Sequence, residues 1–262
     1  MKWFHQEKHW ELGNFIMVTP ALRLLSDRDK ARIPVYFDTK SVEQLYHQCP
    51  FIDVLRVKPA CPPLATTKSP RRNKGESDYD AWCRILIGNR GPSPLPYVDV
   101  SGEAELVRGN GQKHVAVFHG GLGNYWLPKK DIGPVALEYI LTALRKWRYT
   151  PVLLGDDRDF QHFWKRIAID DGCVNCIGSL SMVDSVKILS QCDAFISNDT
   201  GLYHVAGALN KIGLVLWKTT NHEKNRSPCA LIQHFKDERG KVHNYIRAVD
   251  QFLQRLSKDQ CG

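Results

Sequence analysis

The sequence predicts an α/β protein of two Rossmann-like units, each a parallel sheet flanked by helices, which face each other across a cleft. Two observations carry this prediction. Short apolar runs alternate with amphipathic segments along most of the 262 residues, which is the pattern of strand–helix–strand units. A polar connection at 101–113 separates two consecutive sets of such segments. We therefore expect two units.

The composition is that of a globular protein, with 43% hydrophobic and 24% charged residues. No run of about 18 apolar residues is present, so no membrane-spanning helix is expected, and the N-terminus lacks the apolar core of a signal peptide. We expect a cytoplasmic monomer with reduced cysteines. The net charge of +8 is spread over both halves and suits an anionic partner, such as a nucleotide, a phosphorylated glycan, an anionic membrane or a nucleic acid.

The first half should contain alternating strands and helices followed by a loop. Strands are expected from about residue 2 and at 33–37, 52–57 and 97–100, and helices at 13–27 and 41–48. The stretch 58–78 has four prolines and no periodicity, which predicts a loop. We place the domain boundary at Gln112, which gives domains of residues 1–112 and 113–262.

The second half has a clearer pattern. Strands are expected at 114–121, 150–157, 192–198 and 212–217, and helices at 133–147, 158–169, 181–191, 201–210 and 242–256. Ser181 is the expected N-cap of its helix, with Asp184 three residues later. Helix 133–147 should bury one face that includes Val135, Ile140, Leu141 and Leu144.

The segment SNDTGLYHVAGAL, residues 197–209, lies where a buried strand should give way to a helix. The free N–H groups and partial positive charge of a helix N-terminus form an anion site. Gly201 would let a ligand approach the backbone, the Thr200 hydroxyl could donate to it, and His204 lies one turn into the helix. The alternative is purely structural, with Asp199 as the N-cap and His204 on the surface.

Two motifs resemble metal sites. Cys173 and Cys176 form one Cys-x-x-Cys pair, but a closed zinc site needs four ligands. Asp157 and Asp159 form an Asp-x-Asp pair, although acidic residues are also favoured in a first helical turn. We expect no metal at either place.

Four segments of the chain resemble glycosyltransferase family 9, the heptosyltransferase-like enzymes, whose fold is GT-B. They are LGNFIMVTPALRLL, GGLGNYWLPKKDIGPVALEYILTAL, TPVLLGDDRD and the long block from Ser179 to Trp217 that contains DTGLYHVAGAL. The resemblance is good over 113–218, short over 12–25 and weak between 58 and 112. It implies metal-independent, inverting transfer of a sugar from a nucleotide-diphosphate donor, which is a substrate, with no cofactor.

The resemblance also implies where the donor binds. The C-terminal domain should hold it, with a terminal helix that can cross back to the first domain. A lysine should neutralise the diphosphate, and both Lys129 and Lys130 are candidates. The remaining expected donor contacts are Asp199, which shapes the loop, Thr200, Gly201, His204, Thr219, Thr220 and Glu223.

The acceptor should bind the N-terminal domain near Gly13. Many members of the family carry an acid directly after this glycine, but here the residue is Asn14, whose amide cannot accept a proton at neutral pH. Glu11 is the first candidate for the base, and His9 and Glu7 are weaker ones. The basic residues Lys68, Arg71 and Arg72, next to Lys74, are further acceptor contacts.

Three functions remain open at this point. The first is a glycosyltransferase acting on a saccharide or glycolipid, as in lipopolysaccharide assembly at the inner membrane face. The second uses the same chemistry on nucleic acid, such as a hydroxymethylated base in phage DNA. The basic cluster favours it, and so do Trp3, Trp10 and Trp82 if they stack on bases. The third is a non-catalytic sugar-nucleotide-binding protein, suggested by Asn14.

Overall fold

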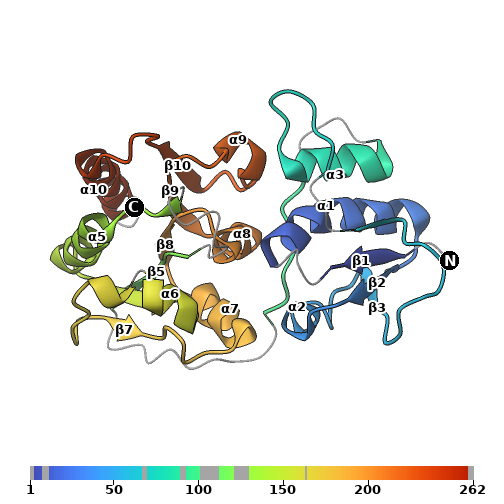
Figure 1. Cartoon of the computed structure of the whole chain (residues 1–262), viewed down its shortest axis with the longest axis horizontal. Coiled ribbons are helices and arrows are strands. Elements are labelled where there is room, and N and C mark those ends of the chain that lie inside the picture. The colour runs from blue at the N-terminus through green and yellow to red at the C-terminus, as the bar shows by residue number, and fades with distance from the viewer. Residues whose placement is uncertain are drawn as a thin grey trace.

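The computed structural model describes residues 3–7, 12–66, 70–88, 93–100, 112–120, 130–162 and 164–258. It contains two sheets, one in each half of the chain, and all their strand pairs are parallel (Figure 1). This confirms the predicted α/β class. None of the helices in these ranges is both long and apolar enough to cross a lipid bilayer.

The first sheet has four strands in the order β3-β2-β1-β4. The strands are β1 (Phe4–Gln6), β2 (Ile33–Phe37), β3 (Ile52–Val54) and β4 (Ala65–Thr66), and the helices of this half are α1 (Leu12–Asp29), α2 (Lys40–Gln44) and α3 (Asp78–Ile87). Helix α1 contains Pro20, whose missing N–H leaves the Ile16 carbonyl without its usual helical donor. The Thr19 hydroxyl donates to that carbonyl at 2.8 Å, so the helix continues through the proline.

Four predictions for the first half are wrong. Residues 97–100 do not form a strand, because their backbone bonds elsewhere: Tyr97 N–H donates to the Thr19 hydroxyl, and Asp99 N–H to the Leu45 carbonyl. The expected loop 58–78 contains β4 and the first residue of α3. The expected elements 41–48 and 52–57 end early, at Gln44 and Val54.

The second sheet has six strands in the order β10-β9-β8-β5-β6-β7. They are β5 (Lys113–Phe118), β6 (Tyr149–Leu154), β7 (Val174–Asn175), β8 (Ala194–Ser197), β9 (Ile212–Trp217) and β10 (Ile232–Lys236). This is the doubly wound order, in which the second and third strands are added on one side of the first strand, and the fourth strand is added on its other side. Here the first strand is β5 and the fourth is β8.

The second sheet is buried on both faces. Successive side chains of a strand point to opposite faces, so Val115 and Val117 of β5 pack in one hydrophobic cluster, and Ala116 and Phe118 in another. The helices of this half are α5 (Pro134–Lys146), α6 (Asp157–His162), α7 (Met182–Gln191), α8 (Gly201–Ala208), α9 (His222–Asn225), α10 (Val242–Lys258) and the short 3₁₀ helix η1 (Trp164–Arg166). Helices α5 and α10 contribute to the first cluster, and α7 and α8 to the second.

Most elements expected in the second half are present. Ser181 is the N-cap of α7 and accepts a hydrogen bond from Asp184 N–H at 3.1 Å. Two details are wrong. The expected helix 158–169 is replaced by the shorter α6 and η1, and Val135 in the first turn of α5 is exposed. The strands β7 and β10 were not expected.

The two halves share one hydrophobic core. Helix α1 contacts α8, α2 contacts α7 and α3 contacts α9, and one connected cluster of buried side chains runs from Phe4 to Ile232. The two sheets lie on either side of Gln112, and the division into domains there stays a prediction. Helix α10 packs on α5 and β9, so its described part, which ends at Lys258, does not cross back to the first half.

Candidate functional site

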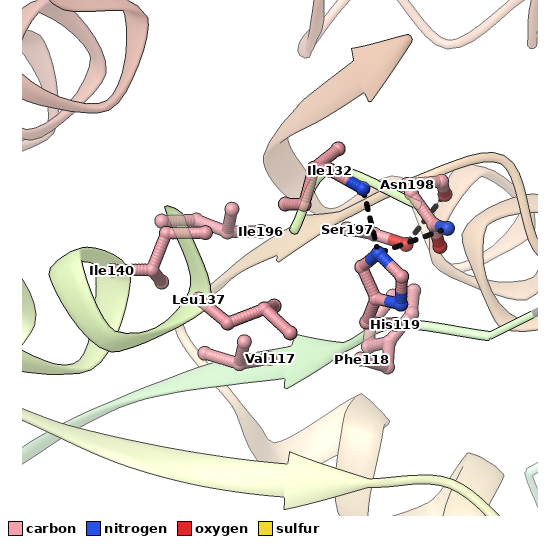
Figure 2. A pocket seen from close by; sticks show the side chains of 9 residues that line it. All are labelled: Val117, Phe118, His119, Ile132, Leu137, Ile140, Ile196, Ser197 and Asn198. Atoms are coloured by element: carbon pink, nitrogen blue, oxygen red, sulfur yellow. Dashed lines mark hydrogen bonds between the residues drawn. The ribbon is translucent and has the colours of Figure 1, made fainter. Parts of the chain in front are cut away.

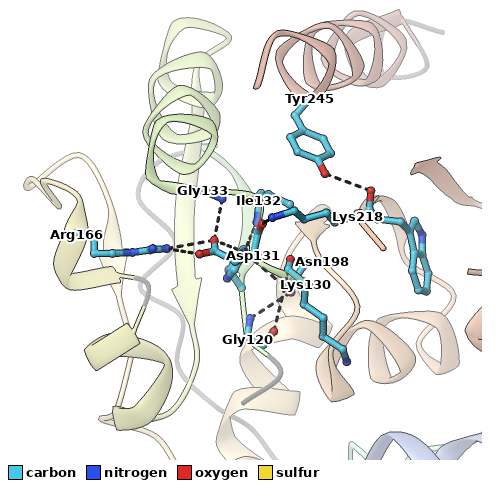
Figure 3. A network of polar contacts seen from close by, with 11 residues as sticks. Gly120, Lys130, Asp131, Ile132, Gly133, Arg166, Asn198, Lys218 and Tyr245 are labelled. Atoms are coloured by element: carbon cyan, nitrogen blue, oxygen red, sulfur yellow. Dashed lines mark hydrogen bonds and ion pairs between the residues drawn. The ribbon is translucent and has the colours of Figure 1, made fainter. Parts of the chain in front are cut away.

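The candidate site lies at the carboxyl ends of β5 and β8, where ligands bind in doubly wound sheets. Asn198, directly after β8, is buried and joins three segments (Figure 3). Its Oδ1 accepts from Gly120 N–H at 3.2 Å, and its Nδ2 donates to the Gly120 carbonyl at 3.0 Å and the Lys130 carbonyl at 3.1 Å. These bonds hold the segments that follow β5 and precede α5 against the end of β8.

Asp199 is buried beside the start of α8 and is paired with Lys130. The ammonium group of Lys130 lies 3.2 Å from Asp199 Oδ2 and donates to the Asp199 carbonyl at 2.8 Å. Asn225 Nδ2 approaches both carboxylate oxygens, at 3.3 and 3.4 Å. Asp199 therefore shapes this loop, and the cation of Lys130 is fixed next to the N-terminus of α8.

Thr200, and not Asp199, is the N-cap of α8. Its Oγ1 accepts from Tyr203 N–H at 3.3 Å. The hydroxyl proton is still available for an anion, because Oγ1 acts only as an acceptor in this bond. The alternative in which Asp199 caps this helix is therefore wrong.

The N-terminus of α1 lies against the N-terminus of α8 (Figure 1). A Cβ atom added to Gly13 would lie 3.4 Å from Gly201 Cα and 3.0 Å from His204 Cδ2. Gly13 therefore allows a close approach of two helix starts that lie 188 residues apart in numbering. Each start presents free N–H groups and partial positive charge, so the junction favours an anion.

His204 is buried at this junction and not on the surface, so that alternative is also wrong. Its Nδ1 lies 2.7 Å from the hydroxyl of Tyr79 in α3. Burial lowers the pKa of His204 to about 4, so the ring is uncharged at neutral pH. An uncharged imidazole can donate one hydrogen bond and accept another.

A second polar cluster fixes the segment around Lys130 (Figure 3). The guanidinium of Arg166 bonds both carboxylate oxygens of Asp131, at 3.1 and 3.0 Å. Lys218, after β9, donates to the Asp131 carbonyl at 3.2 Å, and Ile132 N–H donates to His119 Nε2 at 3.2 Å. Burial lowers the pKa of His119 to about 4. This cluster is structural and holds Lys130 in place.

A gap lies behind this sheet edge, between β5, β8 and α5 (Figure 2). Its walls are mainly the apolar side chains Val117, Leu137, Ile140 and Ile196. It is too narrow to hold a water molecule, so it is a packing gap and not a ligand site.

Thr219, Thr220 and Glu223 follow β9 at the same edge of the sheet. Thr219 and Glu223 are exposed and Thr220 is buried. Asn221 caps α9 by accepting from Lys224 N–H at 3.1 Å. The structure therefore places these residues near the carboxyl end of β9, and their contact with a nucleoside stays a prediction.

The structure describes some of the residues that were predicted to bind the acceptor. Asn14 is half-buried in the first turn of α1, next to Gly13. Arg71 is exposed, whereas the guanidinium of Arg72 lies 3.2 Å from the buried carboxylate of Asp78. The base candidates Glu11 and His9, and also Lys68 and Lys129, lie outside the described residues. Glu7 is half-buried at the end of β1.

Two of the tryptophans considered for base stacking belong to the core. Trp3 and Trp82 are buried, and Trp82 packs edge-on against Phe4. Trp10 lies outside the described residues. Trp3 and Trp82 therefore offer no face to a nucleic acid in this structure.

Both acids of the Asp-x-Asp motif, Asp157 and Asp159, lie in the first turn of α6. Asp156 accepts from Asp159 N–H at 2.9 Å, and Asp159 accepts from Asp156 N–H at 3.2 Å, which is the reciprocal arrangement of a capping box. Across the ranges that the structure describes, no group of three His, Cys, Asp or Glu side chains could hold a metal ion.

The two parallel sheets and their strand orders define an α/β protein of the GT-B fold. Residues 144–245 match the family model Glycosyltransferase family 9 (heptosyltransferase), so this part of the chain carries the sequence signature of the family. The resemblance stated above is thereby confirmed.

Solved structures of this family share the fold over nearly the whole chain. A glycosyl transferase family 9 protein from Veillonella parvula superposes with a TM-score of 0.74 and 13% identity, covering 97% of both chains. The Escherichia coli ADP-heptose LPS heptosyltransferase II gives 0.69 and 14%, covering 97% of this chain and 99% of the other. An E. coli heptosyltransferase solved with ADP-2-deoxy-2-fluoro heptose gives 0.64 and 11%, with 97% and 99% covered.

Curated relatives match over short segments. The lipooligosaccharide heptosyltransferase 2 of Haemophilus ducreyi is 44% identical over 39 residues, which are 15% of this chain and 11% of that protein. The enzyme of the same name from Haemophilus influenzae is 35% identical over 49 residues, 19% of this chain and 14% of that protein. Each match thus spans about a seventh or less of the curated relative.

The sequence analysis missed the residues that α3 and α9 bring to the junction. Tyr79 and Asp78 come from α3, and Lys224 and Asn225 from α9. One signal for α3 was available: Ser77 and Asp80 have the same spacing as Ser181 and Asp184, and Ser77 does cap α3. No local pattern could show that Tyr79 meets His204.

Proposed function

We propose that this protein is a heptosyltransferase-like glycosyltransferase that transfers a sugar from a nucleotide-diphosphate donor to a saccharide or glycolipid hydroxyl, with inversion and without a metal. The observation that carries the proposal is the start of α8. There, free backbone N–H groups and the Thr200 hydroxyl lie beside the ammonium group of Lys130, which Asp199 holds in place. These groups carry the charge and the hydrogen-bond donors that favour a diphosphate, which supports the proposal.

The chemistry follows from the charges. The acceptor oxygen attacks the anomeric carbon from the face opposite the leaving group and forms the new glycosidic bond. The bond between that carbon and the diphosphate oxygen breaks, and the nucleotide diphosphate leaves with the electron pair. Negative charge therefore grows on the diphosphate, where Lys130 and the amides of α8 stabilise it. The acceptor proton passes to a base, for which Glu11 is the first candidate and Asn14 orients the hydroxyl.

The first experiment measures release of nucleotide diphosphate from a panel of nucleotide sugars, with ADP-heptose included because similar enzymes carry that donor in their names. We expect one donor to be hydrolysed in the absence of an acceptor. Its turnover should be faster when a saccharide acceptor is added. The anomeric configuration of the product, read by NMR, should be inverted. Turnover of no donor would favour the non-catalytic alternative, and retention would contradict the proposed mechanism.

Two variants test the roles. Lys130→Met should lower kcat by roughly 10²-fold, as expected for loss of a charge that stabilises the transition state. Lys236→Met, on the edge strand β10, is the matched control and should retain activity. Glu11→Ala should abolish transfer but keep donor binding. Full activity of Glu11→Ala would move the base to another residue.

The acceptor class is tested separately with hydroxymethylated DNA. Binding that weakens steeply with salt, together with transfer to the DNA, would support a nucleic-acid acceptor. We expect neither, because Trp3 and Trp82 are buried and Arg72 is paired with Asp78.

A further inference from the structure

Tyr79 reaches from the first half of the chain to a predicted donor-site residue of the second half. It lies in the first turn of α3, and its hydroxyl is 2.7 Å from His204 Nδ1. Both side chains are buried, so water does not compete for this bond. The contact joins residues 125 positions apart and depends on the packing of the two halves.

Neither group in this contact is charged at neutral pH. Burial lowers the pKa of His204 to about 4 and raises that of Tyr79 well above its usual value. At neutral pH the ring is therefore uncharged, and the phenol keeps its proton. An uncharged imidazole carries one N–H, and the bond made by one nitrogen selects which nitrogen is protonated.

The phenol is the donor in this contact. Tyr79 keeps its proton, and an imidazole nitrogen without a proton accepts hydrogen bonds. The Tyr79 O–H therefore donates to His204 Nδ1, which leaves the imidazole proton on Nε2.

The Nε2 edge of the ring faces the junction of the two helix starts. A Cβ atom on Gly13 would lie 3.0 Å from His204 Cδ2 and 3.7 Å from Nε2. The backbone of α1 thus packs against this edge of the ring, and Gly13 leaves room for it because it has no side chain. The N–H group therefore lies between the first turns of α1 and α8, where an anion would be bound.

We propose that Tyr79 is a positioning residue of the donor site: its hydroxyl holds the uncharged His204 ring in the tautomer with the proton on Nε2, and so directs an N–H donor at the junction of α1 and α8. The proposal rests on the proposed function. An uncharged, fixed donor can bond a diphosphate or sugar oxygen without the mobility of a lysine. The group that receives it is an oxygen of the nucleotide-sugar donor.

The tautomer can be measured without turnover. Long-range ¹H–¹⁵N spectra of histidine-labelled protein distinguish Nε2–H from Nδ1–H, and the His204 signals are identified by their absence in His204→Gln. We expect Nε2–H in the wild type and a mixture of tautomers in Tyr79→Phe. A wild-type ring with its proton on Nδ1, or unchanged signals in Tyr79→Phe, would overturn the proposal.

Tyr46→Phe is the matched control. Tyr46 is another fully buried tyrosine of the first half, and its hydroxyl has no hydrogen-bond partner in the part of the chain that the structure describes. Its loss should leave the His204 spectrum and the catalytic constants unchanged. With the donor identified by the panel above, Tyr79→Phe should lower kcat roughly five-fold, the effect of one net hydrogen bond, with a smaller change in KM.

A second pair of variants keeps the proposal testable if Tyr79→Phe folds poorly. The amide nitrogen of glutamine can replace Nε2–H, whereas the asparagine amide lies near the position of Nδ1. His204→Gln should therefore retain more activity than His204→Asn, and the reverse order would contradict the proposal. If no nucleotide sugar is turned over, the proposed function fails, and the spectra still decide whether Tyr79 sets the tautomer.

Discussion

Asp199 carries the charge that fixes Lys130 next to α8. The carboxylate is buried, and it bonds both Lys130 and Asn225. The residue thus has a structural task at the start of α8, since its oxygens are occupied by side chains of the protein. Its charge sets the position of the cation that would meet a diphosphate.

Asp199→Asn should therefore destabilise the protein. The change leaves the partly buried ammonium group of Lys130 without its counter-charge, which costs about 2 kcal/mol. Urea unfolding would measure this loss in the free energy of unfolding. Glu238→Gln removes a carboxylate that pairs with Lys236 on the surface, and we expect no measurable change from it. Equal stability of the two variants would contradict this account of Asp199.

Gly201 should tolerate a methyl group in the folded protein but not in a complex. A Cβ atom there would lie 3.7 Å from Gly13 N, an ordinary contact, so Gly201→Ala should keep the melting temperature. The same atom would stand where a phosphate approaches the backbone. Isothermal titration with ADP should show roughly ten-fold weaker binding, about 1.4 kcal/mol. Unchanged affinity would place the diphosphate elsewhere.

Among the elements, the start of α7 shows how a short pattern predicts structure. Ser181→Ala removes the side-chain bond to Asp184 N–H and should lower the free energy of unfolding by about 1 kcal/mol. Ser190→Ala, in the last turn of the same helix, is the matched control, because its hydroxyl bonds a carbonyl and caps no N-terminus. Chemical denaturation of both variants measures the difference.

The elements that the sequence predicted well have strong local signals. Strand β9 and its neighbour β8 are apolar runs buried on both faces, and α10 has a buried face through Val249, Phe252 and Leu256. The missed elements lack such signals. Strand β4 has two residues, too few for periodicity, and β10 mixes polar residues into an edge strand. Such strands form because a neighbouring strand pairs with them, and their own residues carry no pattern that predicts them.

The candidate site likewise has a part that the sequence predicted and a part that it did not. The start of α8 was predictable because Thr200 and Gly201 follow a buried strand directly. The partners of its residues were not, since Tyr79 and Asn225 come from helices whose position depends on packing. The family resemblance implied the donor-binding roles, which stay predictions, and it implied no contact between the two halves of the chain.

At the scale of the whole molecule, buried histidines make stability depend on pH. Burial lowers the pKa of both His119 and His204 to about 4, below the value of about 6.5 in an unfolded chain. Between these values the unfolded state binds more protons than the folded state. Stability is therefore full above pH 6.5 and is lost as the pH falls toward 4.

We expect the free energy of unfolding to be lower at pH 5 than at pH 7 by about 2 kcal/mol for each of these histidines. Denaturant unfolding of the wild type and His119→Gln at both pH values tests this. The variant keeps an uncharged acceptor near Nε2 and should have a smaller pH dependence. His243→Gln changes an exposed histidine and should match the wild type, whereas an identical pH dependence in all three proteins would refute the prediction.

The shared core has a consequence for how the protein is made. Leu12 and Tyr79 of the first half are buried, and both lie against α8 of the second half. A ribosome releases the first half while more than a hundred residues are still to be translated, so these apolar surfaces stay uncovered until α8 emerges. We therefore expect the nascent first half to be a client of chaperones, and a fragment of residues 1–112 to aggregate when it is produced alone.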